Sequence, residues 1–293
     1  MLAIVIINYK MDELTISFVR EELSKVTCTH KTVIVNNSAT DESNALLCGA
    51  LDAALVCSGE TEFDIDKDVF VLPATENLGF AKGNNLGAEF CRRWFKPRYI
   101  LFANNDIRLL DENVVEALAD KLDEVQDVGV IGPRIIGLDG VEQSPYPYRS
   151  FWDKEVWMYW STPFYSKEKK GRRFQLDYAK DASEGFHYYV MGSFMMVRAE
   201  DFYMCGMFDP NTFLYAEEPI LSERMKAIHK GVYYYPGVSV VHAHGATTSK
   251  MSRKGSSKLQ FESNVYYYKT YRHSGWITIL IGRITYFLYH IFK

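Results

Sequence analysis

The sequence predicts an α/β fold with a mostly parallel central sheet and helices on both of its faces. Two observations support this prediction. Short runs of small and β-branched apolar residues recur up to about residue 140, as expected of strands that are buried on both faces. Stretches with the apolar spacing of helices separate these runs, and such alternation is typical of parallel sheets.

The expected elements of this first part follow one another in a regular order. The strands are the apolar runs Leu2–Asn8, Lys31–Asn36, Val69–Leu72, Tyr99–Ala103 and Val128–Pro133. The helices between them are Asp12–Val26, Asn84–Trp94 and Glu112–Glu124. A further helix is expected after the polar loop that begins at Asn36, with Thr40 or Asp41 as its N-terminal cap.

The second half of the chain is less regular. Residues 144–184 are rich in Tyr, Trp, Pro and Lys without a clear period, so we expect an irregular segment with a helix around Trp152–Trp160. In compact enzymes such segments often bind the acceptor or form a lid. The elements expected after it are a strand at Val190–Val197, a helix at Ile220–Ile228, and short strands at Val232–Tyr235 and Val238–His242.

The composition is that of a globular protein. The chain has 293 residues, 47% of them hydrophobic, which suits one large domain or one domain with a small appendage. Its net charge of −4 gives no signature of nucleic-acid binding. The five cysteines are scattered and lack metal-site spacing, so we expect neither a zinc site nor disulfides, and a reduced cytoplasmic compartment. The first residues predict a strand rather than a signal peptide.

The C-terminal segment Trp276–Lys293 is apolar and aromatic, with Arg283 near its middle. Its short length and this charge argue against a membrane span. Two interpretations stay open. The segment is either an interfacial helix, attached to the inner face of the cell membrane by aromatic and basic anchors, or a terminal helix that packs onto the core.

A polar cluster of Asn104, Asn105 and Asp106 follows the strand Tyr99–Ala103. A carboxylate at this place lies where open α/β sheets bind ligands, outside the carboxyl ends of the strands. One carboxylate together with phosphate oxygens is a usual way to hold Mg²⁺, so Asp106 is a candidate anchor for a metal ion with a nucleoside diphosphate. The alternative is that the three residues only form a turn, for which Asn and Asp are well suited.

Polar residues also follow the earlier strands. Asn8 and Tyr9 end the first strand, Asn36 ends the second, and a glycine-rich stretch at residues 76–87 follows the third. Its glycines would let the backbone approach a ligand closely, and a helix beginning near Asn84 would present free N–H groups to anionic oxygens. A plain loop between strand and helix is the alternative.

The succession of these segments resembles the family 2 glycosyltransferases, which have the Rossmann-like GT-A fold. The resemblance covers roughly residues 2–250, and its most specific part is Asn77–Asn85, close to the family's Asn-x-Gly-Phe-Ala-x-Gly-Asn-Asn pattern. Asn104-Asn105-Asp106 resembles a variant of the family's metal-binding Asp-x-Asp motif. Residues 191–198 and 206–209 are similar to the strand and helix before the catalytic acid, 213–218 to the segment with the catalytic base, and 241–245 to a histidine-containing metal motif.

The resemblance implies a GT-A domain at residues 1–250, a helical extension at 251–293, and direct displacement with inversion at the anomeric carbon. It implies Mn²⁺ or Mg²⁺ as a Lewis acid on the leaving diphosphate, held by Asp106 with His242 or, as second choice, His244. It implies a UDP- or dTDP-sugar as the donor. The residues expected to contact it are Asn8, Tyr9, Asn36, Asn77, Gly79, Lys82, Asn84, Asn104 and Asn105.

Glu218 is the expected general base that takes the proton of the acceptor hydroxyl, and Glu217 is expected to orient the acceptor or to raise a pKa. The alternative is an acidic pair that only stabilises a helix N-terminus. The metal role of His242 and His244 has an alternative as well. Two histidines two positions apart in a strand can place one side chain in the core and one in solvent. The family commonly has Asp at the position of Glu218, so the resemblance does not fix how the acceptor lies. It also commonly has Asp at the position of Asn36, so the resemblance does not fix which nucleotide base is preferred.

The expected function is sugar transfer from a nucleotide-sugar to a glycan or polyprenyl-linked acceptor in bacterial surface polysaccharide synthesis, such as that of lipopolysaccharide or capsule, similar to rhamnosyl or galactosyl transfer. Two alternatives stay open. A nucleotidyltransferase shares the half-sheet and the metal, but it does not require the late Glu-Glu and His-x-His segments. A catalytically inactive subunit that binds a nucleotide or glycan would lack the slow donor hydrolysis that transferases usually show.

Overall fold

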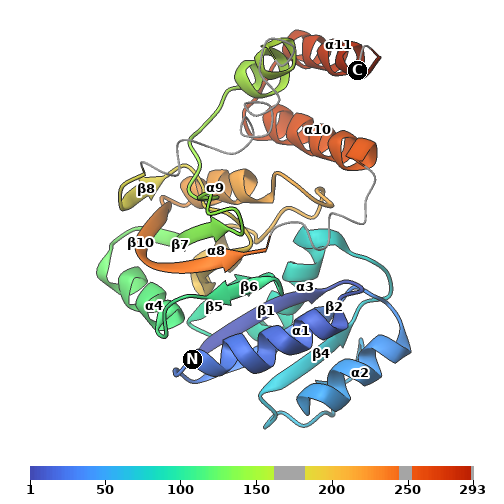
Figure 1. Cartoon of the computed structure of the whole chain (residues 1–293), viewed down its shortest axis with the longest axis vertical. Helices are drawn as coiled ribbons and strands as arrows, with labels where there is room; N and C mark the ends of the chain where they lie inside the picture. Colours follow the sequence, from blue (N-terminus) through green and yellow to red (C-terminus); the bar gives the residue numbers. More distant parts are fainter. Residues whose placement is uncertain (162–181, 244–252, 292–293) are drawn as a thin grey trace.

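The computed structural model of the chain describes residues 1–161, 182–243 and 253–291. In this part of the chain, ten strands form one central sheet in the order β3-β4-β2-β1-β5-β9-β7-β10-β6, with β8 beside β10 (Figure 1). The first half of the sheet is parallel throughout. Its strands are β1 (Leu2–Asn8), β2 (His30–Asn36), β3 (Ala54–Leu55), β4 (Val69–Pro73) and β5 (Tyr99–Ala103).

The second half of the sheet is mixed, which the sequence did not indicate. β9 (Phe194–Arg198) runs antiparallel between β5 and β7 (Val128–Gly137). β10 is one strand, Gly231–His242, where we expected two, and a bulge between Tyr235 and Ser239 marks the expected interruption, because Pro236 there has no N–H for the ladder. The short strands β6 (Ile107–Leu109) and β8 (Gly185–His187) pair antiparallel with β10.

Alternate residues of each central strand enter two separate core layers, as the two-residue period of a strand requires. In β1, Ile4 and Ile6 pack with α1 (Asp12–Ser17), α2 (Asp41–Leu51) and α4 (Val114–Glu124). On the other face, Ala3 and Val5 pack with α3 (Gly79–Trp94), α8 (Ala199–Met204) and α9 (Glu217–Ala227). The expected α/β architecture with helices on both faces is therefore confirmed.

The local sequence predicted the start of one helix correctly and the start of another incorrectly. Thr40 caps α2 as predicted, since its hydroxyl oxygen accepts the N–H of Ser43 at 3.3 Å. α3, in contrast, begins at Gly79 and not near Asn84. Its first turn is closed by a distant loop, because the Phe80 N–H donates to the Phe213 carbonyl at 2.9 Å. Local sequence carries no signal for that contact.

A third apolar cluster joins the irregular segment to the C-terminal helices. A π-helical turn at Trp152–Trp157 continues into α5 (Met158–Ser161), which confirms the helix expected around Trp152–Trp160. Phe151 and Val156 pack with Phe261 and Val265 of α10 (Arg253–Thr270) and with Ile279 of α11 (Trp276–Ile291). The predicted extension thus shares a core with the segments that precede it, and Figure 1 shows α5, α10 and α11 together at one end of the molecule.

Candidate active site

A cavity of about 590 Å³ opens at the carboxyl ends of β5 and β10. The loop before β9 and the first turn of α9 form two of its walls, and the irregular segment with α5 and α10 covers it. Asn104, Asp106, Glu217, Glu218 and His242 all line it. The tertiary structure therefore gathers the predicted metal and catalytic residues into one space, as expected from the position of the strand ends.

The predicted metal ligands face each other. His242 Nε2 lies 3.3 Å from Asp106 Oδ1, and both side chains are buried. The pairing of β6 with β10 causes this approach, since it sets His242 level with Ile107 and is extended by a bond from the Ala243 N–H to the Asp106 carbonyl, 3.0 Å. Asp106 thus lies in a turn, as the alternative interpretation has it, and it also lines the cavity.

The chemistry of this pair fits a divalent cation. His242 Nδ1 lies 2.8 Å from the Gln143 Oε1, which can only accept, so Nδ1 donates its proton. In the neutral ring, Nε2 then directs a lone pair at Asp106 Oδ1, which has no hydrogen-bond partner among the described residues. Adjacent ligands of an octahedral ion at 2.0–2.1 Å lie roughly 3 Å apart, close to the separation seen here.

The protein supplies few ligands to such an ion. Within the described ranges, no third His, Cys, Asp or Glu joins the pair, so substrate oxygens or water would complete the shell, as is common for Mg²⁺. His244, the second choice for the metal, lies outside the described residues.

The two adjacent glutamates begin α9, and backbone geometry sets their direction. Tyr215 and Ala216 have φ of 74° and 67°, a region that costs roughly 1–3 kcal/mol per residue when it is not glycine. Ala216 is held there by its burial in the third apolar cluster. Glu217 and Glu218 do occupy a helix N-terminus, as the alternative interpretation has it, but they also line the cavity.

The environments of the two carboxyl groups differ. Burial, reinforced by the neighbouring Glu218, raises the pKa of Glu217 well above its usual value, and its Oε1 has no hydrogen-bond partner among the described residues. Burial also raises the pKa of Glu218, but the Gly192 N–H, which donates to Oε1 at 3.1 Å, and the Lys154 ammonium oppose the rise. Of the two carboxyl groups, Glu218 is therefore the one whose ionised form is better stabilised.

Three cavity residues were not among the sequence candidates. Lys154 and Glu155 come from the π-helical turn, and burial lowers the pKa of Lys154 and raises that of Glu155 to about 8. Asn264 of α10 donates to Glu155 Oε1 at 2.7 Å. The only signal for them was the irregular composition of residues 144–184, from which an acceptor-binding segment was expected but no particular residue.

Three asparagines that are predicted to contact the donor hold strand ends together. Asn8 Nδ2 donates to Asn36 Oδ1 at 2.8 Å, and the Thr15 hydroxyl bridges Asn8 and Asn105, donating to Asn8 Oδ1 and accepting from Asn105 Nδ2, both at 2.8 Å. Asn8 and Asn36 have no exposed surface. In this arrangement their amides bond to neighbouring side chains and position the ends of β1, β2 and β5.

The glycine-rich stretch also differs from expectation. A Cβ on Gly79, whose φ is +73°, would lie 2.2 Å from the Phe213 carbonyl oxygen, so this glycine allows close approach of protein backbone and not of a ligand. Asn77 Oδ1 accepts the Gly79 N–H at 3.1 Å and fixes the turn. Asn84 is buried within α3, whereas Lys82 is exposed and Tyr9 is half-buried, with Lys10 over its ring.

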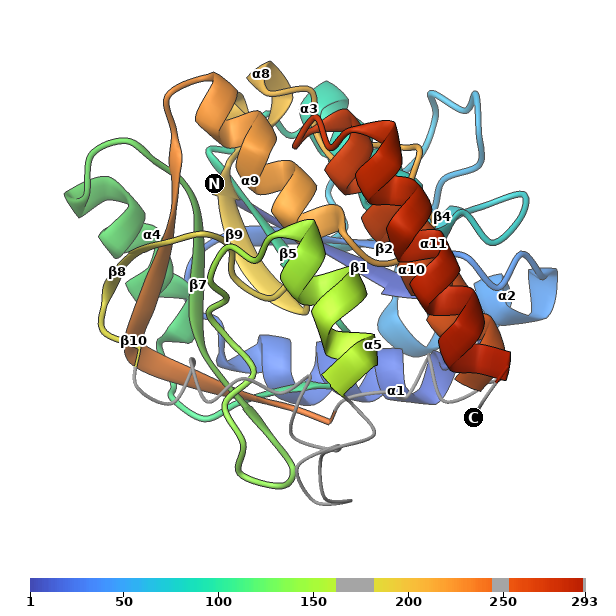
Figure 2. The ribbon, with the colours of Figure 1, turned by 90° about the horizontal axis from the view of Figure 1, so that it is seen from above.

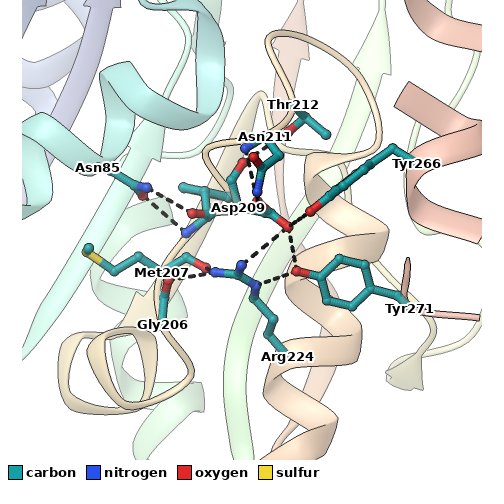
Figure 3. Close-up of polar contacts among 10 residues, drawn as sticks. Asn85, Gly206, Met207, Asp209, Asn211, Thr212, Arg224, Tyr266 and Tyr271 are labelled. Atoms are coloured by element: carbon teal, nitrogen blue, oxygen red, sulfur yellow. Dashed lines mark hydrogen bonds and ion pairs between the residues drawn. The ribbon is translucent and has the colours of Figure 1, made fainter. Parts of the chain in front are cut away.

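A second polar network joins the loop before α9 to α9 and α10 (Figure 3). The buried Asp209 accepts hydrogen bonds from the hydroxyls of Tyr266 and Tyr271 at 2.8 and 2.6 Å and from Asn211. Arg224 lies 3.4 Å from the same carboxylate. Burial alone would raise the pKa of Asp209, but these hydrogen bonds, that of Tyr271 first, lower it overall.

Asp209→Asn is expected to lower the free energy of unfolding by about 3 kcal/mol at pH 7, because a buried charged acceptor is lost while its donors remain. The lowered pKa means that this stabilisation is present above the pKa of the unfolded chain and is lost as pH falls through the folded one. Urea unfolding at pH 7 and pH 3.5 measures both. Asp120→Asn, on the exposed face of α4, is the control. The Asp209 variant and the unmodified chain should differ less in free energy of unfolding at pH 3.5 than at pH 7. An equal difference at both pH values would contradict a stabilising role of the ionised Asp209.

The chain belongs to glycosyl transferase family 2, whose model matches residues 4–197. It is therefore a glycosyltransferase. It is 24% identical over 230 residues to the N-acetylglucosaminyl-diphospho-decaprenol L-rhamnosyltransferase of Mycobacterium tuberculosis (strain CDC 1551 / Oshkosh), covering 71% of this chain and 69% of that protein. It is 23% identical over 219 residues to a low-salt glycan biosynthesis hexosyltransferase of Haloferax volcanii, covering 74% and 59%.

Solved structures confirm the GT-A fold. A mannosyltransferase from Pyrobaculum calidifontis matches with a TM-score of 0.58 at 12% identity, over 94% of this chain and 64% of that one. TarS of S. aureus, residues 1–349, matches with a TM-score of 0.53 at 11% identity, over 94% and 73%. At these identities the likeness concerns the fold alone. The expected α/β class, the GT-A fold and the family are thus confirmed.

Proposed function

We propose that the chain transfers a sugar from a nucleoside diphosphate donor to a hydroxyl group of a glycan or polyprenyl-linked acceptor, with inversion and with the help of Mn²⁺ or Mg²⁺. The observation that carries the proposal is the shared cavity, which both the Asp106–His242 pair and the Glu217–Glu218 pair line. A metal ion held by Asp106 and His242 would neutralise charge on the leaving diphosphate.

The remaining steps belong to side chains of this chain. Glu218 accepts the proton of the attacking hydroxyl, and its ionised form is favoured by the Gly192 N–H and by Lys154. Gln143 fixes the ring of His242. The walls contributed by the irregular segment and α10 carry Tyr146, Tyr268 and Asn264, an aromatic and amide lining of the kind that encloses small polar ligands.

The comparisons support this choice of substrates. The mycobacterial relative is named for a decaprenol-diphosphate-linked acceptor, and the Pyrobaculum mannosyltransferase was solved with GDP-Man and Mn²⁺. For this chain we propose a UDP- or dTDP-sugar as the donor and synthesis of a surface polysaccharide on the cytoplasmic side as the setting. Membership in the family argues against a nucleotidyltransferase.

A donor panel tests the proposal. UDP, dTDP, GDP and their sugars, each with and without Mn²⁺, are measured by thermal shift and by release of free sugar to water. Because a ligand that binds only the folded chain raises the melting temperature, a shift with one nucleotide that depends on Mn²⁺, with slow hydrolysis of its sugar, is the expected result. Binding without hydrolysis would favour the inactive subunit, and absence of both would contradict the proposal.

Lys154→Met is expected to move the acidic limb of the kcat/KM profile to higher pH, with the plateau kept. The Lys154 ammonium favours the ionised form of Glu218, so its removal raises the pKa of the base, and a higher pH is needed to ionise it. A pH series of kcat/KM measures the shift. Lys226→Met, on the exposed end of α9, is the matched control. If the acidic limb of kcat/KM lay at the same pH in both variants, an electrostatic effect of Lys154 on Glu218 would be excluded.

A further inference from the structure

Helix α11 has two apolar faces, of which only one is packed. Ile279, Gly282 and Thr285 are buried, and a Cβ on Gly282 would lie 2.4 Å from the Phe151 ring, so this face lies tightly on the third apolar cluster. The opposite face is apolar and exposed, each side chain by at least 36%. It consists of Trp276, Ile277, Leu280, Ile284, Phe287, Leu288 and Ile291.

The arrangement of these residues is regular. At 3.6 residues per turn, all seven fall within about 120° around the helix axis, with no charged side chain among them. The outer face of a surface helix is normally polar. Contiguous exposed apolar surface of this kind marks a contact with a membrane or another protein.

Further exposed tryptophans lie on the segment that packs against α11. Trp152, Trp157 and Trp160 are 47%, 69% and 58% exposed. Trp160 Nε1 donates to Thr285 at 3.4 Å, and the Tyr159 ring packs edge-on against Tyr286, which joins α5 to α11. With Trp276, four of the five tryptophans of the chain lie on α11 and on the segment Trp152–Ser161, and Figure 2 shows α5 and α11 on the side nearest the viewer. Tryptophan is enriched where apolar tails meet the polar headgroups.

The charge of this part of the chain selects the kind of partner. Residues 243–293 contain eight Lys and Arg and one acidic residue, Glu262, although the whole chain has 33 basic and 37 acidic residues. Arg283, at the edge of the exposed face, is held by Glu262. A basic segment on an acidic protein is attracted to an anionic lipid surface, and a second copy of the same segment would be repelled.

We propose that the α11 surface, meaning the seven apolar residues above with Trp157 and Trp160, docks flat on an anionic lipid bilayer. Among the described residues, no helix is both long enough and apolar enough to cross a membrane. The 16 residues of α11 extend about 24 Å, which suits a helix lying in the interface.

The α11 surface lies close to the cavity, so docking would serve the transfer reaction. This role of the docking rests on the proposed function. Met158 and Tyr159 of α5 line the cavity, while Trp157 and Trp160 of the same segment belong to the docking surface. Docking would therefore bring the cavity to the bilayer, where a polyprenyl-linked acceptor is anchored.

Vesicle binding by the full chain tests the docking without donor or acceptor, so its failure would leave the transfer reaction untouched. Sedimentation is compared for vesicles of phosphatidylcholine alone and with 30% phosphatidylglycerol, and brominated lipids report contact with the tryptophans. We expect binding to the anionic vesicles, quenched tryptophan emission, and a loss of the anionic preference in high salt.

Ile284→Glu with Phe287→Glu is expected to weaken vesicle binding more than tenfold. Both side chains are exposed, so the fold is kept, which a melting curve verifies. The matched control is Leu110→Glu with Leu138→Glu, two leucines 55% and 73% exposed on the connections after β6 and β7, and it should bind like the unmodified chain. Equal binding of both double variants would overturn the proposal. A chain that ignores vesicles but forms dimers that the α11 variant dissociates would also overturn it.

Discussion

Glu218→Gln is expected to lower kcat about a thousandfold while the donor still binds, since general base catalysis contributes 10²–10⁴. Glutamine keeps the shape of the side chain and can still accept the Gly192 N–H at Oε1. It cannot take the proton of the acceptor. Donor affinity by thermal shift and single-turnover transfer measured on the same preparation separate the two effects.

Glu217→Gln is the matched control for this prediction. Burial and the neighbouring Glu218 raise the pKa of Glu217, which favours its neutral form, and glutamine is close to that form in charge and shape. We expect turnover within about threefold of the unmodified chain. If Glu217→Gln abolished transfer and Glu218→Gln retained it, the roles of the two residues would be reversed.

Asp106→Ala is expected to remove the Mn²⁺-dependent part of nucleotide binding. For the unmodified chain, nucleotide at a hundredfold excess over Kd with Mn²⁺ adds about 2.7 kcal/mol, or roughly 5 °C in Tm. In the variant, the shift with Mn²⁺ should equal the shift without it. Turnover should fall at least about a hundredfold, as a lost Lewis acid is worth several kcal/mol.

Asp120→Ala on the exposed face of α4 controls for loss of a carboxylate elsewhere. It should keep the full Mn²⁺-dependent shift. A persistent shift in Asp106→Ala would exclude this residue as the anchor, and its 3.3 Å contact with His242 would then have no part in metal binding.

The candidate site was predictable where local pattern and order along the chain carried the signal. Asp106 and His242 each follow or end a recognisable strand, and Glu217-Glu218 precede a recognisable helix. Their gathering in one cavity follows from the rule for strand ends. The wall formed by Lys154, Glu155 and Asn264 was not predictable, because no short-range pattern relates residues 109 positions apart.

The glycine-rich stretch shows the same limit. Gly79 was recognised as a position of close approach, but the neighbour is the Phe213 backbone, 134 residues later in the chain. For the same reason α3 begins earlier than the sequence predicts, because that contact closes its first turn. Similarly, Asn8 and Asn36 were recognised as polar strand ends, and only packing revealed that they bond to each other.

The sequence by itself determined the α/β class, the approximate positions of β1, β2, β4, β5 and β7, and the start of α2. These depend on apolar periodicity and on caps such as Thr40, which act over a few residues. Only the tertiary structure decided the antiparallel β9, the facing of Asp106 and His242, and the meeting of α5 and α10 over the cavity, with α11 packed against them. Those features depend on which buried surfaces meet, and that is a property of the folded chain as a whole.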